Sequence, residues 1–182
     1  MAEPSRESRL SGETIYSGRV VVLEVDRVRM PHGGESVREV IRHRGAAVVL
    51  PILDDGSVVM VRPYRYPVAK SLLELPAGTL EPGEDPMGCA ARELVEETGF
   101  RARSLSPLGR FYSAPGYTDE VLQAVLATGL ERWANASPDH DEIIEVELVA
   151  AADVLKRIET GEIADAKTIA TMMLARLRGV SL

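Results

Sequence analysis

The stretch GTLEPGEDPMGCAARELVEETGF, from Gly78 to Phe100, carries the strongest signals for both a helix and a chemical site. Asp85 is a residue type that caps helix N-termini, Pro86 suits the first helical position, and Gly99 suits the residue after the last turn. These signals predict a helix from Pro86 to Thr98. At 3.6 residues per turn, one helix face should pack on a sheet. Its expected members are Met87, Ala90, Ala91, Leu94 and Thr98.

Three glutamates crowd the second half of this predicted helix. Glu93 and Glu97 are four residues apart and share a side of the helix, with Glu96 close by. Like charges at this spacing repel each other, so a divalent cation is expected to offset them. Carboxylates suit Mg²⁺ or Mn²⁺, and the chain has no His and Cys set of the kind that binds zinc. The alternative interpretation is a solvated acidic helix face.

The residues around the glutamates add further candidates. Arg92, four residues before Glu96, is expected either to hold that carboxylate or to pair with a carboxylate of the glycine loop. The loop Gly78–Gly83 allows the backbone to come close to a metal or a phosphate, which makes the Ala77 carbonyl a candidate ligand. Cys89, the one cysteine, is expected to be a small buried residue. Without a possible internal disulfide, a cytoplasmic location is the natural expectation.

The fixed residues of this stretch form a single pattern that resembles the Nudix box. The box reads Gly-x5-Glu-x7-Arg-Glu-hydrophobic-x-Glu-Glu-x-Gly-hydrophobic, and a chance match is on the order of 10⁻⁸ to 10⁻⁹ per window. The resemblance implies an α+β protein, the Nudix α/β/α sandwich with a mixed sheet. It also implies hydrolysis of a nucleoside diphosphate linked to another group. The family's metal ligands match Glu93, Glu96 and Glu97, of which Glu93 and Glu97 are also catalytic candidates. The matching positions are Gly78, Glu84, Arg92, Glu93, Glu96, Glu97 and Gly99.

The sequences flanking the box resemble the ADP-ribose pyrophosphatases of that family. VRPYRYPVAKSLLELPAGTLEPGEDP (61–86) and SAPGYTDE (113–120) carry this resemblance, and Pro115 lies fifteen residues beyond the box. PDHDEIIEV (138–146) resembles the acidic loop that carries a catalytic glutamate in those enzymes, at Glu142 here. The implied reaction converts ADP-ribose to AMP and ribose 5-phosphate with Mg²⁺, or Mn²⁺ as the alternative, at two or more ions per site. Taken singly, each flank also fits an ordinary turn or surface loop.

This resemblance suggests roles for residues outside the box. Glu142 would accept a proton from the attacking water. Arg65, with Arg62 as a second candidate, would offer a positive fork to the phosphate oxygens. Gly116 and Glu120 would lie near the terminal ribose. Two rival functions are a diphosphatase for GDP-mannose or another nucleotide sugar, and a non-catalytic Nudix module that binds a nucleotide. Such modules usually lack box glutamates, which are all present here.

The N-terminal third is expected to be separate from the hydrolase. Residues 1–43 are predicted as an N-terminal tail and a β-hairpin, and residues 44–182 as the Nudix domain. Met1–Gly12 is polar, and the chain is expected to start as a frayed tail. In the resembling enzymes such a segment pairs with a second subunit and completes its adenosine pocket. The resemblance therefore implies a strand-exchanged homodimer in which Arg38 or Arg42 reaches the partner's site. The three histidines, His32, His43 and His140, are expected to face solvent.

Composition and patterning set the remaining limits. The chain has 182 residues and a net charge of −7, which argues against a general nucleic-acid binder. No apolar run reaches the roughly 18 residues of a membrane span, so neither nucleic acid nor membrane is expected as a partner. Period-two and apolar runs predict strands at 19–30, 36–42, 46–53, 57–62, 72–75, 106–113, 120–128 and 145–149. Helical spacing predicts two further helices, at 152–159 and 164–178.

Overall fold

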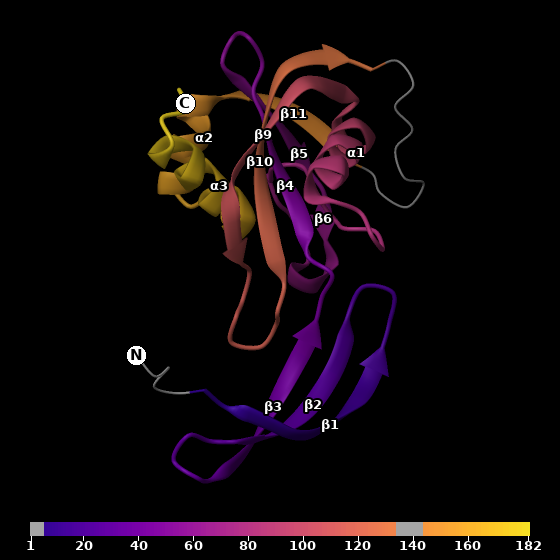
Figure 1. Cartoon of the computed structure of the whole chain (residues 1–182). Helices are drawn as coiled ribbons and strands as arrows, with labels where there is room; N and C mark the ends of the chain where they lie inside the picture. Colours follow the sequence, from indigo (N-terminus) through magenta and orange to yellow (C-terminus); the bar gives the residue numbers. More distant parts are fainter. Residues whose placement is uncertain (1–5, 134–143) are drawn as a thin grey trace. The chain divides into compact units, whose positions relative to one another are not determined.

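The computed structural model describes residues 6–133 and 144–182 and contains two compact units (Figure 1). The first unit takes the chain up to Arg44 together with Tyr112–Val121, and the second takes Gly45–Phe111 and Leu122–Leu182. No helix in these described residues is long and apolar enough to cross a membrane.

The first unit is a three-stranded antiparallel sheet in the order β1-β2-β3. Its strands are β1 (Ser8–Ser17), β2 (Val22–Arg29) and β3 (Glu35–Arg42). The predicted hairpin is confirmed as β2 and β3. The sequence predicted no strand before Arg19, and the structure adds β1, which begins at Ser8. Every side chain of β1 is exposed. The strand is held by backbone hydrogen bonds to β2 and has no apolar alternation that would have revealed it.

The second unit is a mixed sheet system between helices, as expected. One sheet has the order β8-β4-β10-β9 with β4 and β10 parallel, and β11 pairs antiparallel with β5. The strands are β4 (Ala46–Pro51), β5 (Ser57–Arg62), β6 (Tyr64–Arg65), β7 (Lys70–Ser71), β8 (Ala77–Thr79), β9 (Phe100–Tyr112), β10 (Val121–Arg132) and β11 (Glu145–Ala150). The helices are η1 (Tyr66–Val68), α1 (Pro86–Thr98), α2 (Ala151–Glu159) and α3 (Ala166–Leu177).

Strand β4 divides the interior of this unit into two cores. Ala46, Val48 and Leu50 pack in the core that includes residues of α2 and α3, and Ala47 and Val49 pack in the core that includes α1. Successive side chains of a strand point to opposite faces, so a strand covered on both sides reads as a continuous apolar run. Figure 1 shows α1 on one face of the sheet and α2 and α3 on the other. This arrangement confirms the predicted sandwich.

The segment before the glycine loop differs from the expected strand at Leu72–Leu75. It makes a single bridge, between Val61 and Glu74. Two of its other backbone N–H groups have partners outside a strand ladder: Leu72 N donates to the Pro63 carbonyl at 3.2 Å, and Leu75 N donates to the Thr168 hydroxyl at 2.8 Å. Such partners satisfy backbone hydrogen-bonding groups without strand pairing, and a local sequence pattern does not reveal them.

Candidate active site

Helix α1 begins and ends where the sequence predicted, and this places the box glutamates. Asp85 Oδ1 accepts hydrogen bonds from Met87 N at 2.9 Å and Gly88 N at 3.1 Å. Gly99 ends the helix in the left-handed conformation, with φ of 69°. The buried face consists of Cys89, Ala90, Leu94 and Thr98. Ala91 was expected on that face but is exposed. The buried face includes Cys89 in its place.

The glycine loop lies directly against two of the box glutamates. Pairing of β8 with β4 sets Gly78 opposite Ala47, and the Glu93 carboxylate fills the place where a side chain at Gly78 would stand. A Cβ at Gly78 would lie 1.7 Å from Glu93 Oε1. Ala77 N donates to Glu97 Oε2 at 3.0 Å. Glu93 and Glu97 are therefore both packed on the short segment Ala77–Gly78.

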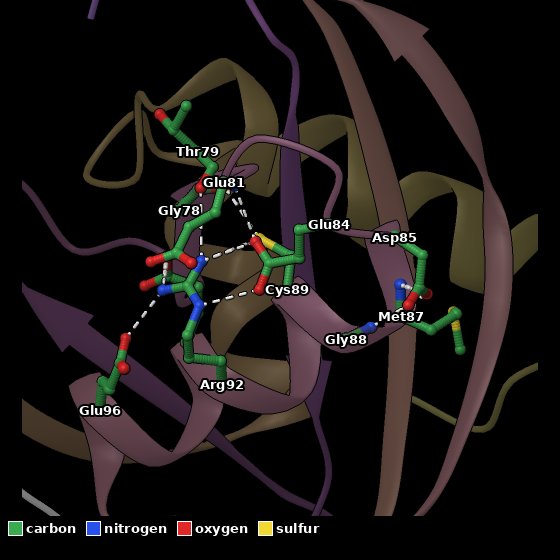
Figure 2. Close-up of polar contacts among 11 residues, drawn as sticks. Gly78, Thr79, Glu81, Glu84, Asp85, Met87, Gly88, Cys89, Arg92 and Glu96 are labelled. Atoms are coloured by element: carbon green, nitrogen blue, oxygen red, sulfur yellow. Dashed lines mark hydrogen bonds and ion pairs between the residues drawn. The ribbon is translucent and has the colours of Figure 1, made fainter. Parts of the chain in front are cut away.

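Arg92 links the glycine loop to the acidic side of α1 (Figure 2). Its Nε donates to Glu84 Oε1 at 2.9 Å, and its Nη1 donates to Glu93 at 2.7 Å and to Glu96 at 2.8 Å. The expected pairing with Glu96 is confirmed, and the second carboxylate, Glu84, directly follows the loop Gly78–Gly83. The guanidinium faces three carboxylates, which leaves the cluster with net negative charge. The Glu84 hydrogen bond is the main reason why the pKa of Arg92 is raised.

These residues fit a divalent cation. The candidate ligands around Arg92 are all oxygens, and the carboxylates outnumber the one guanidinium. The lack of a side chain at Gly78 leaves room for the Glu93 carboxylate beside the backbone. Among the described residues, however, no three acidic, His or Cys side chains converge as a ready metal site. The reason is visible in the contacts: Arg92 Nη1 contacts both Glu93 and Glu96, while Glu97 contacts the Ala77 amide.

The Glu84–Arg92 pair predicts a pH-dependent loss of stability. The hydrogen bond from Arg92 lowers the pKa of Glu84 from 4.5 to about 2. A carboxyl group with a lowered pKa stabilises the fold above its unfolded pKa, and this contribution is lost as pH falls through its folded pKa. Glu84→Gln should therefore destabilise the metal-free protein by about 1–3 kcal/mol at pH 7. The difference from the unmodified protein should shrink between pH 4.5 and about 2.

Chemical denaturation in EDTA, repeated down this pH range, measures that difference. Glu81→Gln is the matched control because Glu81 is an exposed residue of the same loop. A Glu84→Gln deficit that stays constant with pH would show that the ion pair does not account for it.

The two candidate phosphate-binding arginines have different partners. Arg65 contacts Glu74 through Nε at 3.1 Å and Nη2 at 2.8 Å. Arg62 Nε donates to Glu147 at 2.5 Å, across the β5–β11 pair. Lys167 also contacts Glu74, and neither Glu74 nor Lys167 was singled out in the sequence. A signal for Glu74 was present, since it is the one charged residue in the apolar run LLELP. Lys167 lies far along the chain and gave none.

The remaining candidates of the first unit form ion pairs within it. Arg38 contacts Glu7, with Nη2 at 2.5 Å from Oε1. Arg42 contacts Glu24 at 3.0 Å and Asp119 at 3.3 Å. Both arginines retain exposed surface, at 38% and 41% of the side chain.

The segment 112–121 brings Glu120 close to a histidine. Glu120 Oε1 lies 3.5 Å from His43 Nδ1, and only 8% of the His43 side chain is exposed. The expectation that His43 faces solvent is therefore wrong, whereas His32 is exposed as expected. Gly116 is exposed, in the turn closed by Tyr117 N donating to the Ala114 carbonyl. Glu142 and His140 lie outside the described residues.

Comparison with known proteins places this geometry in a family. Residues 42–172 match the NUDIX domain. The chain belongs to the Nudix family. It is 40% identical over 173 residues to an ADP-ribose pyrophosphatase of Bacillus subtilis (strain 168), covering 94% of each protein. It is also 40% identical over 179 residues to a methanol dehydrogenase activator of Bacillus methanolicus, covering 98% of this chain and 97% of the relative.

A solved structure extends the likeness to three dimensions. The crystal structure of an ADP compounds hydrolase aligns with a TM-score of 0.83 and 26% identity, covering 96% of this chain and 95% of that one. This Nudix protein is accordingly a hydrolase that acts on pyrophosphate bonds. Nudix hydrolases generally need divalent metal ions, which agrees with the oxygen donors of the box and with the three carboxylates around Arg92.

Proposed function

We propose that this Nudix hydrolase splits the pyrophosphate bond of ADP-ribose, and of related ADP-sugars, to release AMP and ribose 5-phosphate. The observation that carries the proposal is the 40% identity, over 94% of both chains, to an ADP-ribose pyrophosphatase. The intact set of box glutamates argues against a non-catalytic nucleotide-binding module. We also propose a cytoplasmic location, in keeping with a single, buried cysteine.

Glu93, Glu96, Glu97 and the Ala77 carbonyl would hold the metal in this proposal. Mg²⁺ is the expected ion, Mn²⁺ the alternative, and two or more ions would share the site. When bound, the metal supplies positive charge to the pyrophosphate oxygens and acidifies the attacking water. Metal binding by Glu93 and Glu96 would replace part of their hydrogen bonding with Arg92. The hydrogen bond to Glu84 would keep the Arg92 guanidinium in place.

The other residues would bind the substrate and move the proton. Arg65, whose side chain is 37% exposed, would present its guanidinium to a phosphate. Arg62 is the second candidate, and its side chain is 30% exposed. Gly116 and Glu120 would lie near the terminal ribose. Glu142 would accept the proton of the attacking water, and its support is its position in the acidic segment 138–146.

A substrate panel tests the proposal. Purified protein with Mg²⁺, and separately with Mn²⁺, is given ADP-ribose and GDP-mannose at equal concentrations, and the products are separated by chromatography. AMP and ribose 5-phosphate released at the higher kcat/KM support the proposal. Preference for GDP-mannose, or no turnover of either compound, would overturn it. Reaction in ¹⁸O-labelled water then shows which phosphorus is attacked.

Glu142→Gln should lower kcat by about 10²–10⁴-fold, the usual contribution of a general base, with KM and metal affinity largely preserved. Steady-state kinetics and a metal titration measure these quantities. Glu145→Gln, in the exposed first position of β11, is a nearby control for charge loss. Near-normal turnover of Glu142→Gln would move the base to Glu120 or a box glutamate.

We also propose that residues 1–43 form a dimerisation segment and that residues 44–182 form the hydrolase domain. β1 exposes Leu10, Ile15 and Tyr16, which are 41%, 54% and 59% accessible, along a sheet edge. Exposed apolar edges of this kind are suited to pairing with another chain. In a strand-exchanged homodimer, Arg38 or Arg42 would reach the partner's site.

The dimer has a direct test in the mass of the protein in solution. Light scattering after size exclusion should give twice the mass of one 19.8 kDa chain. Ile15→Lys together with Tyr16→Lys should shift the protein toward a monomer and lower kcat/KM. A monomeric mass for the unmodified protein at assay concentration would remove the proposal.

A further inference from the structure

Glu74 is a buried carboxylate in an otherwise apolar segment, and two cationic side chains contact it. Its side chain is 1% exposed. Arg65 donates to it through Nε and Nη2, and Lys167 Nζ contacts its Oε2. A buried charge is costly unless it is paired. The two cations explain how a carboxylate can be accommodated at this position of the core.

Lys167 connects this carboxylate to the first turn of α3. Its Nζ lies 3.0 Å from Asp165 Oδ2, and Asp165 caps the helix by accepting from Thr168 N at 3.0 Å. The Thr168 hydroxyl in turn accepts from Leu75 N at 2.8 Å. The start of α3 therefore holds both the Glu74 side chain and the next backbone amide of the chain.

The same short segment supports the box. Glu74 pairs with Val61 through both of its backbone groups at 2.9 Å, and the Pro76 carbonyl accepts from Val49 N at 2.8 Å. Ala77 N then donates to Glu97. The segment 74–77 therefore binds Arg65 through Glu74 at one end and contacts the box residue Glu97 through the Ala77 amide at the other.

The second cation holds the Glu74 carboxylate from the side of α3. Lys167 Nζ contacts both Glu74 Oε2 and Asp165 Oδ2, the latter at 3.0 Å. Asp165 Oδ2 also accepts from Thr168 N at 3.0 Å, so the helix cap fixes the position of Asp165. The cations Arg65 and Lys167 and the carboxylates Glu74 and Asp165 therefore form one charge-balanced network.

We propose that Glu74 and Lys167 are positioning residues for Arg65. Glu74 fixes one edge of the guanidinium, and Lys167 holds the Glu74 carboxylate in place from the start of α3. The backbone beneath Arg65 is a two-residue strand, β6, so its side-chain direction depends on this anchor. The inference rests on the proposed phosphate-binding role of Arg65.

A double-mutant cycle tests whether Lys167 acts through Arg65. Lys167→Met should raise KM for ADP-ribose about ten-fold, the size of one charged hydrogen bond, with kcat little changed. In an Arg65→Ala background the same change should have less than about a two-fold effect. Lys167→Arg should restore most of the loss. Lys156→Met, an exposed lysine of α2, is the charge control. Equal effects in both backgrounds would overturn the inference.

A spectroscopic readout separates this inference from the proposed function. The Arg65 Nε–H signal in a ¹H–¹⁵N spectrum, assigned by its loss in Arg65→Lys, should shift in Glu74→Gln and Lys167→Met. Glu147→Gln, which alters the Arg62 pair instead, should leave that signal in place. An unmoved Arg65 signal in folded Lys167→Met would overturn the positioning role. A moved signal with unchanged KM would keep the positioning role and reject phosphate binding by Arg65.

Discussion

Replacing Glu97 with glutamine is expected to lower turnover by at least about 100-fold while the protein stays folded. Glutamine keeps an oxygen that can accept the Ala77 N–H bond, which is 3.0 Å long here. What it removes is the negative charge. The variant therefore separates a structural contact from a metal-binding one, and it should also require more metal ion for half-maximal activity.

The measurement is kcat as a function of Mg²⁺ concentration, with the midpoint of chemical denaturation recorded alongside. Glu131→Gln is a suitable control, since Glu131 is a surface carboxylate paired with Arg103 at 3.4 Å. If Glu97→Gln showed an unchanged metal titration and near-normal turnover, Glu97 would be a loop anchor and no more.

Gly78→Ala should abolish most of the activity with little change in stability. The new Cβ would lie 1.7 Å from Glu93 Oε1 and 2.0 Å from Glu93 Cδ, so the carboxylate must move. The end of a glutamate side chain can swing away at little cost to the fold. A displacement of about 1 Å at a reacting centre is nevertheless enough to cost roughly 100-fold in rate.

Gly34→Ala provides the matched control, because the nearest atom to its added Cβ is His32 Nε2 at 3.7 Å. Kinetics and denaturation of both variants should show loss of kcat in Gly78→Ala alone, at similar midpoints. Normal turnover in Gly78→Ala would mean that the position of the Glu93 carboxylate against the loop is dispensable.

The sequence predicted features whose causes are local. The cap at Asp85, the glycine at Gly99 and the 3.6-residue spacing between them act within a few residues, so the helix and its acidic side were foreseen. The two-faced burial of β4 was likewise visible as an apolar run.

Features that depend on distant partners were missed. β1 is held by backbone bonds to β2 and carries no apolar pattern. His43 is covered by tertiary contacts, one of them to Glu120. Lys167 meets Glu74 across 93 positions of sequence. No local pattern encodes such pairings, because their energy comes from groups that only folding brings together.

Cys89 gives this enzyme a built-in probe of its own loop opening. Its Sγ lies 3.4 Å from the Gly78 carbonyl, and burial raises the pKa of the thiol to about 12. Since thiolates are the reactive form, labelling requires the glycine loop to leave the helix first. It is the only cysteine in the chain. The rate at which a thiol reagent labels Cys89 therefore measures how often the glycine loop opens. A metal ion or a substrate analogue that stabilises the closed loop would slow this labelling.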